Sequence, residues 1–384
     1  MVFDFSTAGR IVFGLGAFEE TKAWLPALGR RVLVVGGFDQ ARYAPLIAAL
    51  AADGRATERA GVAGEPSVAD VERLVAKIHA FGADSVVAFG GGSALDAGKA
   101  AAALATNPGP IADYLEIIGR GLPLEKPPLP MVAVPTTAGT GAEVTRNAVL
   151  NVPERHVKVS LRGPFVLPKL ALVDPMLCLA LPPKLTAATG MDAITQLIEA
   201  YVSCRANPLS DGFALTGLHA ARWGLRAAYQ DGSDPQAREA MALAALMSGL
   251  ALTSAGLGVV HGFASPIGGA FPIAHGEICA ALLAPAMLVN IRAVRERAPD
   301  GEALARFTRV AQLLTDRPEA SPEEGVEWVR RLVAELGLAG IARQGVSESF
   351  RGELGVLAAR SNSMKGNPIP LLPREFADVL RLAG

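Results

Sequence analysis

The chain has 384 residues, of which 51% are hydrophobic and 19% are charged, and its formal net charge is -1 at pH 7. This length exceeds what one hydrophobic core usually supports, so we expect two domains. The near-neutral charge excludes the basic surface that nucleic-acid binding needs, and it favours a small-molecule substrate.

The three cysteines, Cys178, Cys204 and Cys279, lie far apart and form no CxxC pair. This spacing argues against a disulfide framework and against a thiolate zinc site, and it favours a reducing, cytoplasmic compartment. The first residues, MVFDFSTAGRIVFG, include an early acid and no basic-then-apolar run. We therefore expect no signal peptide.

The first half of the chain alternates short β-branched runs with helical patterns, which predicts parallel strands covered by helices. The runs VLVV (32–35), SVVAF (85–89) and MVAV (131–134) are continuously apolar. Such runs are typical of strands that are buried on both faces. Gly14 and Gly16 precede them but lack the third glycine of a GxGxxG fingerprint, so we interpret them as an ordinary turn.

The residues after VLVV bear on the choice of nicotinamide cofactor. An acid at this place often binds the ribose 2'-hydroxyl of NAD and repels the 2'-phosphate of NADP. Asp39 favours NAD, whereas Arg42 favours NADP. The choice between NAD and NADP stays open at this point.

A glycine-rich turn, Gly90, Gly91, Gly92 and Ser93, follows SVVAF and precedes a helix predicted to start near Ala94. Glycines let backbone amides approach an anion, and a helix N-terminus adds the positive end of its dipole. A tight strand-to-helix turn without a ligand is the alternative. Three consecutive glycines followed by a serine favour a phosphate or pyrophosphate site.

A second polar segment, PTTAGTGAEVT, follows MVAV and contains Thr136, Thr137, Thr140 and Thr145. Ligands of open α/β folds collect at the carboxyl ends of the strands, where these hydroxyls are expected to lie. The threonines could hold ribose or phosphate. A polar loop without a ligand explains this segment alone equally well.

From about Leu181 onward nearly every segment has a helical pattern, so we predict an α/β domain over residues 1–180 and a helical domain over residues 181–384. Residues 240–276 contain no Asp, Glu, Lys or Arg, a length that could span a membrane. Glycines and prolines interrupt this stretch. We therefore expect buried helices and no membrane span.

The segment MDAITQLIEAY (191–201) places Asp192 and Gln196 on one helix face, with Glu199 a further near-turn along. His261 and His275 are separated by glycines and prolines, so two helices that meet at this break could aim both imidazoles at one point. An aspartate and two histidines aimed at one point form a divalent-metal site with an open position. Either histidine alone could equally be a hydrogen-bonded core residue.

The sequence resembles the iron-containing, or group III, alcohol dehydrogenases over nearly its whole length. The likeness rests on seven segments in the family's order and spacing: GGGSALDAGKA, PTTAGTGAEVT, HVKVSL, LVDPMLCLALPP, GMDAITQLIEAYVS, HGFASPIGGAFPIAHGEICAALL and SMKGNPIPL. The resemblance implies an N-terminal dinucleotide-binding α/β domain with a mostly parallel sheet, an all-α C-terminal domain, an active site in the cleft between them, and a homodimer. It also implies a metal-dependent, NAD(P)-linked oxidoreductase that interconverts an alcohol and an aldehyde or ketone.

The resemblance further implies roles for individual residues. Asp192, His261 and His275 match metal-ligand positions, the two histidines being the catalytic candidates, and Gln196 stands at a fourth ligand position. The metal is expected to be Fe²⁺ or Zn²⁺. Eight residues match cofactor-binding positions: Gly91, Gly92, Ser93, Thr136, Thr137, Thr140, Lys158 and Leu177.

Two positions depart from the family's pattern. Gln196 stands where the family usually has a histidine, and its neutral carbonyl oxygen is a weaker ligand than imidazole. Gln196 therefore binds through oxygen or through water, or three protein ligands suffice, or no metal binds. Ser265 stands where many relatives carry a histidine near the nicotinamide, which removes an obvious group for proton transfer. Glu199 is expected to support the ligands rather than to be one.

Three alternative functions stay open, of which the first and the third follow from these departures. The first is a metal-independent reductase of the maleylacetate reductase type on the same fold. The second is a lyase of the dehydroquinate synthase type, which needs a basic cluster that the sequence around the two histidines does not contain. The third is a nucleotide-binding protein that has lost its catalytic activity.

Overall fold

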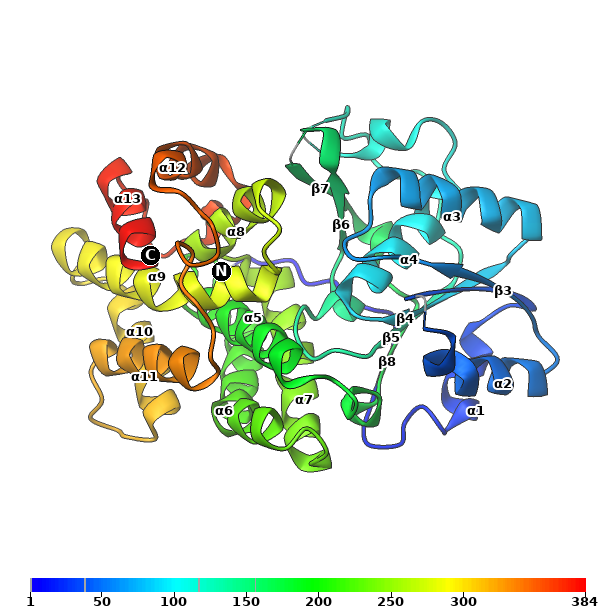
Figure 1. The fold of residues 1–384 in the computed structure, drawn as a ribbon, viewed down its shortest axis with the longest axis horizontal. Helices are drawn as coiled ribbons and strands as arrows, with labels where there is room; N and C mark the ends of the chain where they lie inside the picture. Colours follow the sequence, from blue (N-terminus) through cyan, green and yellow to red (C-terminus); the bar gives the residue numbers. More distant parts are fainter. Residues whose placement is uncertain (1, 38, 117, 156) are drawn as a thin grey trace. The chain divides into compact units, whose positions relative to one another are not determined.

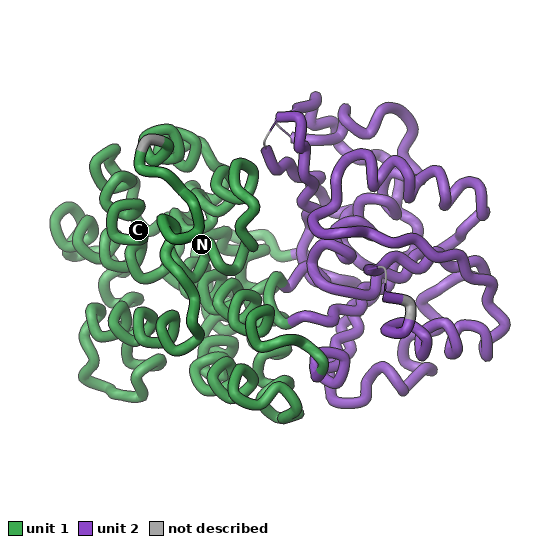
Figure 2. The backbone as a smooth tube through the Cα atoms, in the orientation of Figure 1, with its two compact units in different colours: residues 1–5, 138–140, 180–384 green, residues 6–137, 141–179 purple. Residues whose placement is uncertain are grey.

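The computed structural model of the protein describes residues 2–37, 39–116, 118–155 and 157–384 (Figure 1). It has two compact units (Figure 2): an α/β unit of residues 6–137 and 141–179, and a helical unit of residues 1–5, 138–140 and 180–384. The cleft implied by the resemblance stays a prediction, as does the domain division at residue 180. His156, the first residue of the HVKVSL segment, lies outside the described residues.

The α/β unit contains a six-stranded sheet in the order β1-β8-β5-β4-β2-β3, and every neighbouring pair in it is parallel. The predicted parallel sheet is therefore confirmed. VLVV, SVVAF and MVAV all lie in central strands, where both faces are covered. The strands are β1 (Ile11–Phe13), β2 (Arg31–Gly36), β3 (Ala56–Gly61), β4 (Ser85–Gly90), β5 (Met131–Pro135) and β8 (Leu170–Val173).

The two faces of this sheet are covered by different helices because side chains alternate along each strand. Val32 and Val34 of β2 pack in one cluster with Trp24 and Leu46, which come from α1 (Thr21–Trp24) and α2 (Ala44–Ala52). Leu33 of β2 packs on the other face with residues of α3 (Val68–Phe81) and α4 (Gly92–Leu104). Both faces of the sheet are therefore shielded from solvent.

The order of the strands reverses between β2 and β4, which are neighbours in the sheet. Val32 of β2 pairs with Ser85 of β4 at one end, and Gly36 pairs with Phe89 at the other. From β2 the chain moves to β3 on one side, and it then returns to place β4 on the other side. Ligands of open α/β sheets bind at such a switch point, beyond the carboxyl ends of the strands. The sheet order therefore puts the ends of β2 and β4 at the expected nucleotide site.

An antiparallel pair, β6 (Asn147–Val152) and β7 (Val157–Arg162), lies outside the parallel sheet. This pair was not predicted from the sequence. Ala148, Leu150 and Val152 alternate with partly exposed residues, which is the pattern of a strand with one buried face. The remaining short helical turns of this unit are η1 (Leu25–Ala27), η2 (Gln40–Tyr43), η3 (Ile111–Tyr114), η4 (Ala142–Val144), η5 (Pro153–Arg155), η6 (Pro164–Val166) and η7 (Pro175–Cys178).

The helical unit is built around α5 (Pro183–Val202), in which every residue from Gly190 to Val202 is buried. Several helices begin at a proline that follows a capping side chain, such as Asn207 or Asp234, a typical start signal. The other helices are α6 (Pro208–Gln230), α7 (Pro235–Ala255), α8 (Val259–Ala270), α9 (His275–Arg297), α10 (Glu302–Thr315), α11 (Pro322–Glu335), α12 (Arg351–Arg360) and α13 (Pro373–Leu382), with short turns η8 (Glu348–Phe350) and η9 (Asn362–Gly366).

The stretch without Asp, Glu, Lys or Arg covers most of α7, all of α8 and the start of α9, and α7 and α8 are bent by 104° at the break between them. Among the described residues, α9 is the one single helix that is long and apolar enough to cross a membrane. If the bent pair α7 and α8 is counted as one span, it is a second candidate. In α9, 83% of the apolar window is buried inside the protein. This burial is the pattern of a core helix.

Candidate functional site

Three buried polar side chains, Asp192, Gln196 and Glu199, lie along α5. Their spacing of four and three residues puts them on one side of the helix. Buried polar groups need partners, because an unpaired one loses its hydration without compensation. The partners of Asp192 and Glu199 come from the first turns of α8 and α9.

His261 lies in the first turn of α8, and His275 is the first residue of α9. The two imidazole rings have centroids 5.3 Å apart, so two helix starts do aim both histidines at one place. The break between the helices is shorter than the sequence suggested. Pro266 lies inside α8, which continues to Ala270, and only residues 271–274 separate the helices.

Gly276 allows α9 to approach α5 closely. A Cβ atom at this position would lie 2.0 Å from the carbonyl oxygen of Ala188 on α5, so any side chain would push the two helices apart. His275 precedes this contact and Cys279 follows it by less than one turn. The close approach at Gly276 therefore allows the side chains of His275 and Cys279 to reach Asp192.

Four potential ligand atoms converge at this place, one each from Asp192, His261, His275 and Cys279, and all lie within 4.8 Å of one another. Oδ1 of Asp192 is 3.3 Å from Nε2 of His261 and 3.5 Å from Nε2 of His275. Sγ of Cys279 is 3.6 Å from Oδ1 of Asp192 and 3.9 Å from Nε2 of His261. The three residues predicted to meet are therefore brought together, with a fourth beside them.

Cys279 was missed because the sequence argument required paired cysteines for a thiolate site. A site of mixed ligands needs only one thiolate, and the four-residue spacing of His275 and Cys279 puts both on one face of α9. That spacing, next to a histidine already singled out, was the signal that could have identified the cysteine.

The distances from Oδ1 of Asp192 to the other three donor atoms fit a divalent cation. Nitrogen, oxygen and sulfur donors bind zinc at about 2.0–2.3 Å, so donors at the corners of a tetrahedron lie about 3.3–3.7 Å apart. The three distances from Oδ1 of Asp192, 3.3, 3.5 and 3.6 Å, fall in that range. Asp192 and Cys279 are buried, whereas the His275 side chain is 34% exposed, so the cluster is accessible on the His275 side.

The electrostatics of the cluster also favour a cation. Burial alone would raise the pKa of Asp192, but His275 and His261 beside it lower that pKa below its usual value. Burial alone would lower the pKa of His261, but the Cys279 sulfur and the Asp192 carboxylate raise it well above its usual value. The acidic side chains thus favour positive charge within the cluster, which a bound divalent cation would supply.

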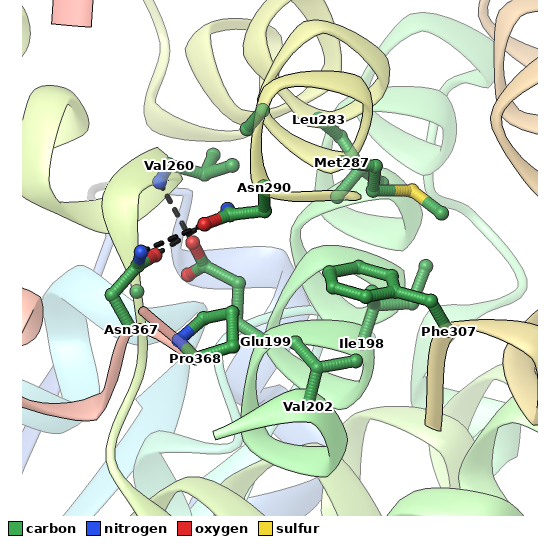
Figure 3. Close-up of a pocket in the computed structure, with 12 residues that line it drawn as sticks. Ile198, Glu199, Val202, Val260, Leu283, Met287, Asn290, Phe307, Asn367 and Pro368 are labelled. Atoms are coloured by element: carbon green, nitrogen blue, oxygen red, sulfur yellow. Dashed lines mark hydrogen bonds between the residues drawn. The ribbon is translucent and has the colours of Figure 1, made fainter. Parts of the chain in front are cut away.

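The supporting hydrogen bonds come from Glu199 and the start of α8. Oε1 of Glu199 accepts from the backbone N–H of Val260 at 2.7 Å, and Oε2 lies 2.7 Å from Nδ1 of His261. Oδ1 of Asn367 accepts from the backbone N–H of Val259 at 3.1 Å, and Asn290 holds Asn367 in turn. Figure 3 shows Glu199 and Asn367 meeting at this helix start beside apolar side chains. A side chain at Gly258 would lie 2.9 Å from both acceptors, so the glycine keeps this space open.

Gln196 and Ser265 occupy different positions relative to the cluster. Oε1 of Gln196 lies 2.8 Å from Oγ of Ser248, and the Gln196 side chain also hydrogen-bonds Asp192 and lowers its pKa. Its polar atoms therefore have protein partners, and its predicted role as a ligand stays a prediction. Ser265 lies on α8 one turn after His261 and is partly buried. Its role in proton transfer also stays a prediction.

In the α/β unit, α4 begins at Gly92 with Gly91 as its N-cap, two residues earlier than predicted. Ser93 therefore lies in the first turn rather than at the cap, and no side chain caps this helix. The first backbone amides of an uncapped helix need partners, which an anion supplies. The turn follows β4 at the switch point of the sheet, so the local structure fits a pyrophosphate.

The other predicted cofactor-binding residues are distributed around the ends of the central strands. Thr136 and Thr137 follow β5; the Thr136 N–H bonds the Gly90 carbonyl oxygen, and a Cβ at Gly91 would touch Thr137. Leu177 lies in η7 after β8. The remaining two are placed differently: Thr140 belongs to the helical unit, and Lys158 on β7 has its Nζ 2.6 Å from Oε1 of Glu65.

Comparison with known proteins identifies relatives along both units. Residues 8–175 match the family described as "Iron-containing alcohol dehydrogenase", and residues 186–383 match "Fe-containing alcohol dehydrogenase family, C-terminal". The long-chain-alcohol dehydrogenase 1 of Geobacillus thermodenitrificans is 39% identical over 326 residues, which are 84% of this chain and 80% of that protein. The NAD-dependent methanol dehydrogenase of Bacillus methanolicus is 35% identical over 307 residues, 78% of this chain and 77% of that protein. A crystal structure of a 1,3-propanediol oxidoreductase aligns with a TM-score of 0.92 at 30% identity, covering 100% of both chains.

Proposed function

Because this chain belongs to the iron-containing alcohol dehydrogenase family, we propose that it interconverts a small alcohol and its aldehyde or ketone at the Asp192, His261 and His275 cluster. The resemblance seen in the sequence is confirmed, and members of this family are oxidoreductases that bind NAD(H) and a divalent metal. The observation that carries the proposal is the convergence of these three side chains, from α5, α8 and α9, on one point.

The proposed roles of the helical unit's residues follow from their contacts. Asp192, His261 and His275 hold the metal through Oδ1 and the two Nε2 atoms. Glu199 accepts a hydrogen bond from Nδ1–H of His261, which leaves Nε2 with a free lone pair toward the cluster. When bound, the metal supplies Lewis-acid polarisation of the substrate oxygen, and the nicotinamide carries the hydride. The accessible His275 side is where we propose that substrate enters.

The proposed roles in the α/β unit concern the nicotinamide cofactor. Gly91, Gly92 and Ser93 bind the pyrophosphate at the start of α4, and Thr136 and Thr137 contribute hydroxyls beside it. We propose NAD rather than NADP, since Asp39 follows β2 at the same edge of the sheet as the α4 turn and would repel a 2'-phosphate. The NAD dependence named for the methanol dehydrogenase relative supports this choice. Equal rates with NADH and NADPH would contradict it.

The proposal is tested by metal content and turnover together. Purified protein should contain one divalent metal per chain and oxidise members of a panel of short and medium alcohols with NAD. His275→Ala should lose metal and turnover in parallel. Full activity after complete metal removal would instead support the metal-independent reductase alternative, which Gln196 favours because an amide is a weak ligand.

Two further features of the working protein belong to this proposal. We propose a homodimer, supported by the family likeness, and a cytoplasmic location, supported by Cys178, Cys204 and Cys279, which form no disulfide within the described residues. Analytical ultracentrifugation of the purified protein and fractionation of cells test these two statements separately.

A further inference from the structure

Cys279 has the placement of a metal ligand rather than of a packing residue. It lies on α9 four residues after His275, it is fully buried, and its sulfur is 3.6 Å from Oδ1 of Asp192 and 3.9 Å from Nε2 of His261. A buried cysteine usually behaves as a small apolar residue. Here its polar neighbours include Asp192, His261 and His275, the three side chains proposed to bind the metal.

The other three donor atoms leave the fourth position of a tetrahedral metal site for the Cys279 sulfur. Asp192, His261 and His275 supply three atoms, and the Cys279 sulfur joins them with all four within 4.8 Å of one another. Donor atoms that bind one zinc ion tetrahedrally lie about 3.3–3.7 Å from one another. Distances that involve the sulfur are the longer ones, because a zinc–sulfur bond of about 2.3 Å is longer than a zinc–nitrogen bond. The sulfur distances, 3.6 Å to Oδ1 of Asp192 and 3.9 Å to Nε2 of His261, are the longest of those measured from these two atoms. The first lies within the tetrahedral range, and the second requires the sulfur to move toward His261 by about 0.2 Å when the metal binds.

Gln196 does not compete for this fourth position. Its oxygen lies 2.8 Å from the Ser248 hydroxyl, and its side chain also hydrogen-bonds Asp192. The amide thereby orients the carboxylate of Asp192 from the side of α5. A thiolate is a stronger ligand for zinc than a neutral amide oxygen, and Oε1 of Gln196 already accepts the hydrogen bond of the Ser248 hydroxyl. The sulfur is therefore the better fourth donor.

We propose that Cys279 is the fourth protein ligand of the metal, bound as a thiolate, and that it biases the site toward Zn²⁺. The substrate oxygen would then bind as a fifth donor on the accessible His275 side, since catalytic zinc can expand to five-coordinate geometry. This inference rests on the proposed function, because it assigns a ligand to the same metal site. On binding, Cys279 loses its proton to solvent, and the S–H bond is replaced by a sulfur–metal bond. A thiolate donor among two imidazoles and a carboxylate favours zinc over harder divalent ions.

The test uses the full chain, stripped with a chelator and reloaded with Co²⁺ or Zn²⁺. The Co²⁺ protein should show a thiolate-to-cobalt charge-transfer band, and the Zn²⁺ protein should show one sulfur neighbour at about 2.3 Å by X-ray absorption. Cys279→Ser should abolish both signals and weaken Zn²⁺ binding more than about 100-fold, beyond the ~10–100-fold expected for a lost supporting hydrogen bond. Cys204→Ser, which changes an exposed cysteine of the same unit, is the matched control and should keep both signals.

The possible outcomes separate this inference from the proposed function. One bound metal with only nitrogen and oxygen neighbours would overturn the role of Cys279 and leave the metal-dependent function intact. A wild-type chain that takes up no divalent metal would overturn both. If Cys279→Ser fails to fold, the wild-type spectra alone decide, since the sulfur signal requires no variant.

Discussion

Nδ1 of His261 lies 2.7 Å from Oε2 of Glu199, and the other nitrogen of the same ring faces Asp192. Glu199 is itself fixed by the backbone N–H of Val260. A carboxylate only accepts hydrogen bonds, so when a cation lies between Nε2 and Asp192 the Glu199 contact keeps the single proton of the imidazole on Nδ1. The relationship determines which nitrogen of His261 offers its lone pair to the cluster.

Glu199→Gln should therefore weaken metal binding without removing a ligand. The amide has one accepting oxygen for two donors, Val260 N–H and His261 Nδ1–H, so one of the two hydrogen bonds is lost. We expect the metal affinity to fall by ~10–100-fold, as for other supporting partners of a metal-bound histidine. A competition titration against a chromogenic chelator measures it. Glu327→Gln on the exposed face of α11 is the control, and an equal effect there would contradict the role of Glu199.

Gly276→Ala should separate α9 from α5. The added Cβ would lie 2.0 Å from the Ala188 carbonyl oxygen, and overpacking of this kind costs about 1–3 kcal/mol of folding free energy. Because His275 and Cys279 flank this contact, metal content should fall as well. Gly212→Ala on α6 is the matched control, since its Cβ would meet nothing within 4 Å. Chemical denaturation and metal analysis measure both effects, and a fully metallated, equally stable Gly276→Ala protein would refute this explanation.

Glu143→Gln should change how stability depends on pH. Burial raises the pKa of Glu143 from 4.5 to about 7, although its own backbone and Lys99 act in the opposite direction. The unfolded chain therefore loses this proton at a lower pH than the folded chain, and the free energy of unfolding falls as pH rises from about 4.5 to about 7. The loss amounts to roughly 3 kcal/mol at higher pH.

The Glu143→Gln variant has no proton to lose at this position, so its stability relative to wild type should rise through that pH window and reach its full value above it. Thermal unfolding of both proteins at about pH 5 and about pH 8 measures the difference. Glu72→Gln, at an exposed position of α3, should leave the wild-type pH dependence unchanged. A constant difference between Glu143→Gln and wild type at both pH values would contradict the assigned pKa.

Gln196→His should strengthen metal binding. Position 196 lies one helical turn from Asp192, and an imidazole is a better ligand for zinc or iron than an amide oxygen. We expect Zn²⁺ affinity to rise about tenfold, which corresponds to about 1.4 kcal/mol. In a Cys279→Ser background the same change should restore part of the lost affinity. Unchanged affinity in both backgrounds would mean that a side chain at 196 does not reach the cluster.

The sequence predicted what short-range patterns encode. The apolar runs at 32–35, 85–89 and 131–134 identified three central strands because burial on both faces leaves no polar residues in their interiors. The Asp192 and Gln196 spacing identified one face of α5, and the glycine and proline residues between His261 and His275 indicated two helix starts. These patterns allowed Asp192, His261 and His275 to converge, and the family resemblance turned that possibility into a prediction.

Other features depend on contacts that no local pattern records. The β6 and β7 strands are short and partly polar, so their alternating pattern was not recognised. Helix α4 begins at Gly92 rather than near Ala94, because Gly91 serves as its N-cap. Cys279 was set aside because it has no cysteine neighbour in sequence. Its importance comes from the packing of α9 on α5, which brings its sulfur to Asp192.

The central claim is that Asp192, His261 and His275 bind one divalent cation. Diffraction from crystals of the metal-loaded protein, recorded on either side of the metal's absorption edge, locates that ion directly. We predict a single anomalous peak within bonding distance, about 2.0–2.3 Å, of Oδ1 of Asp192 and Nε2 of both histidines. A peak elsewhere, or none in crystals of protein that oxidises alcohols at full rate, would contradict it.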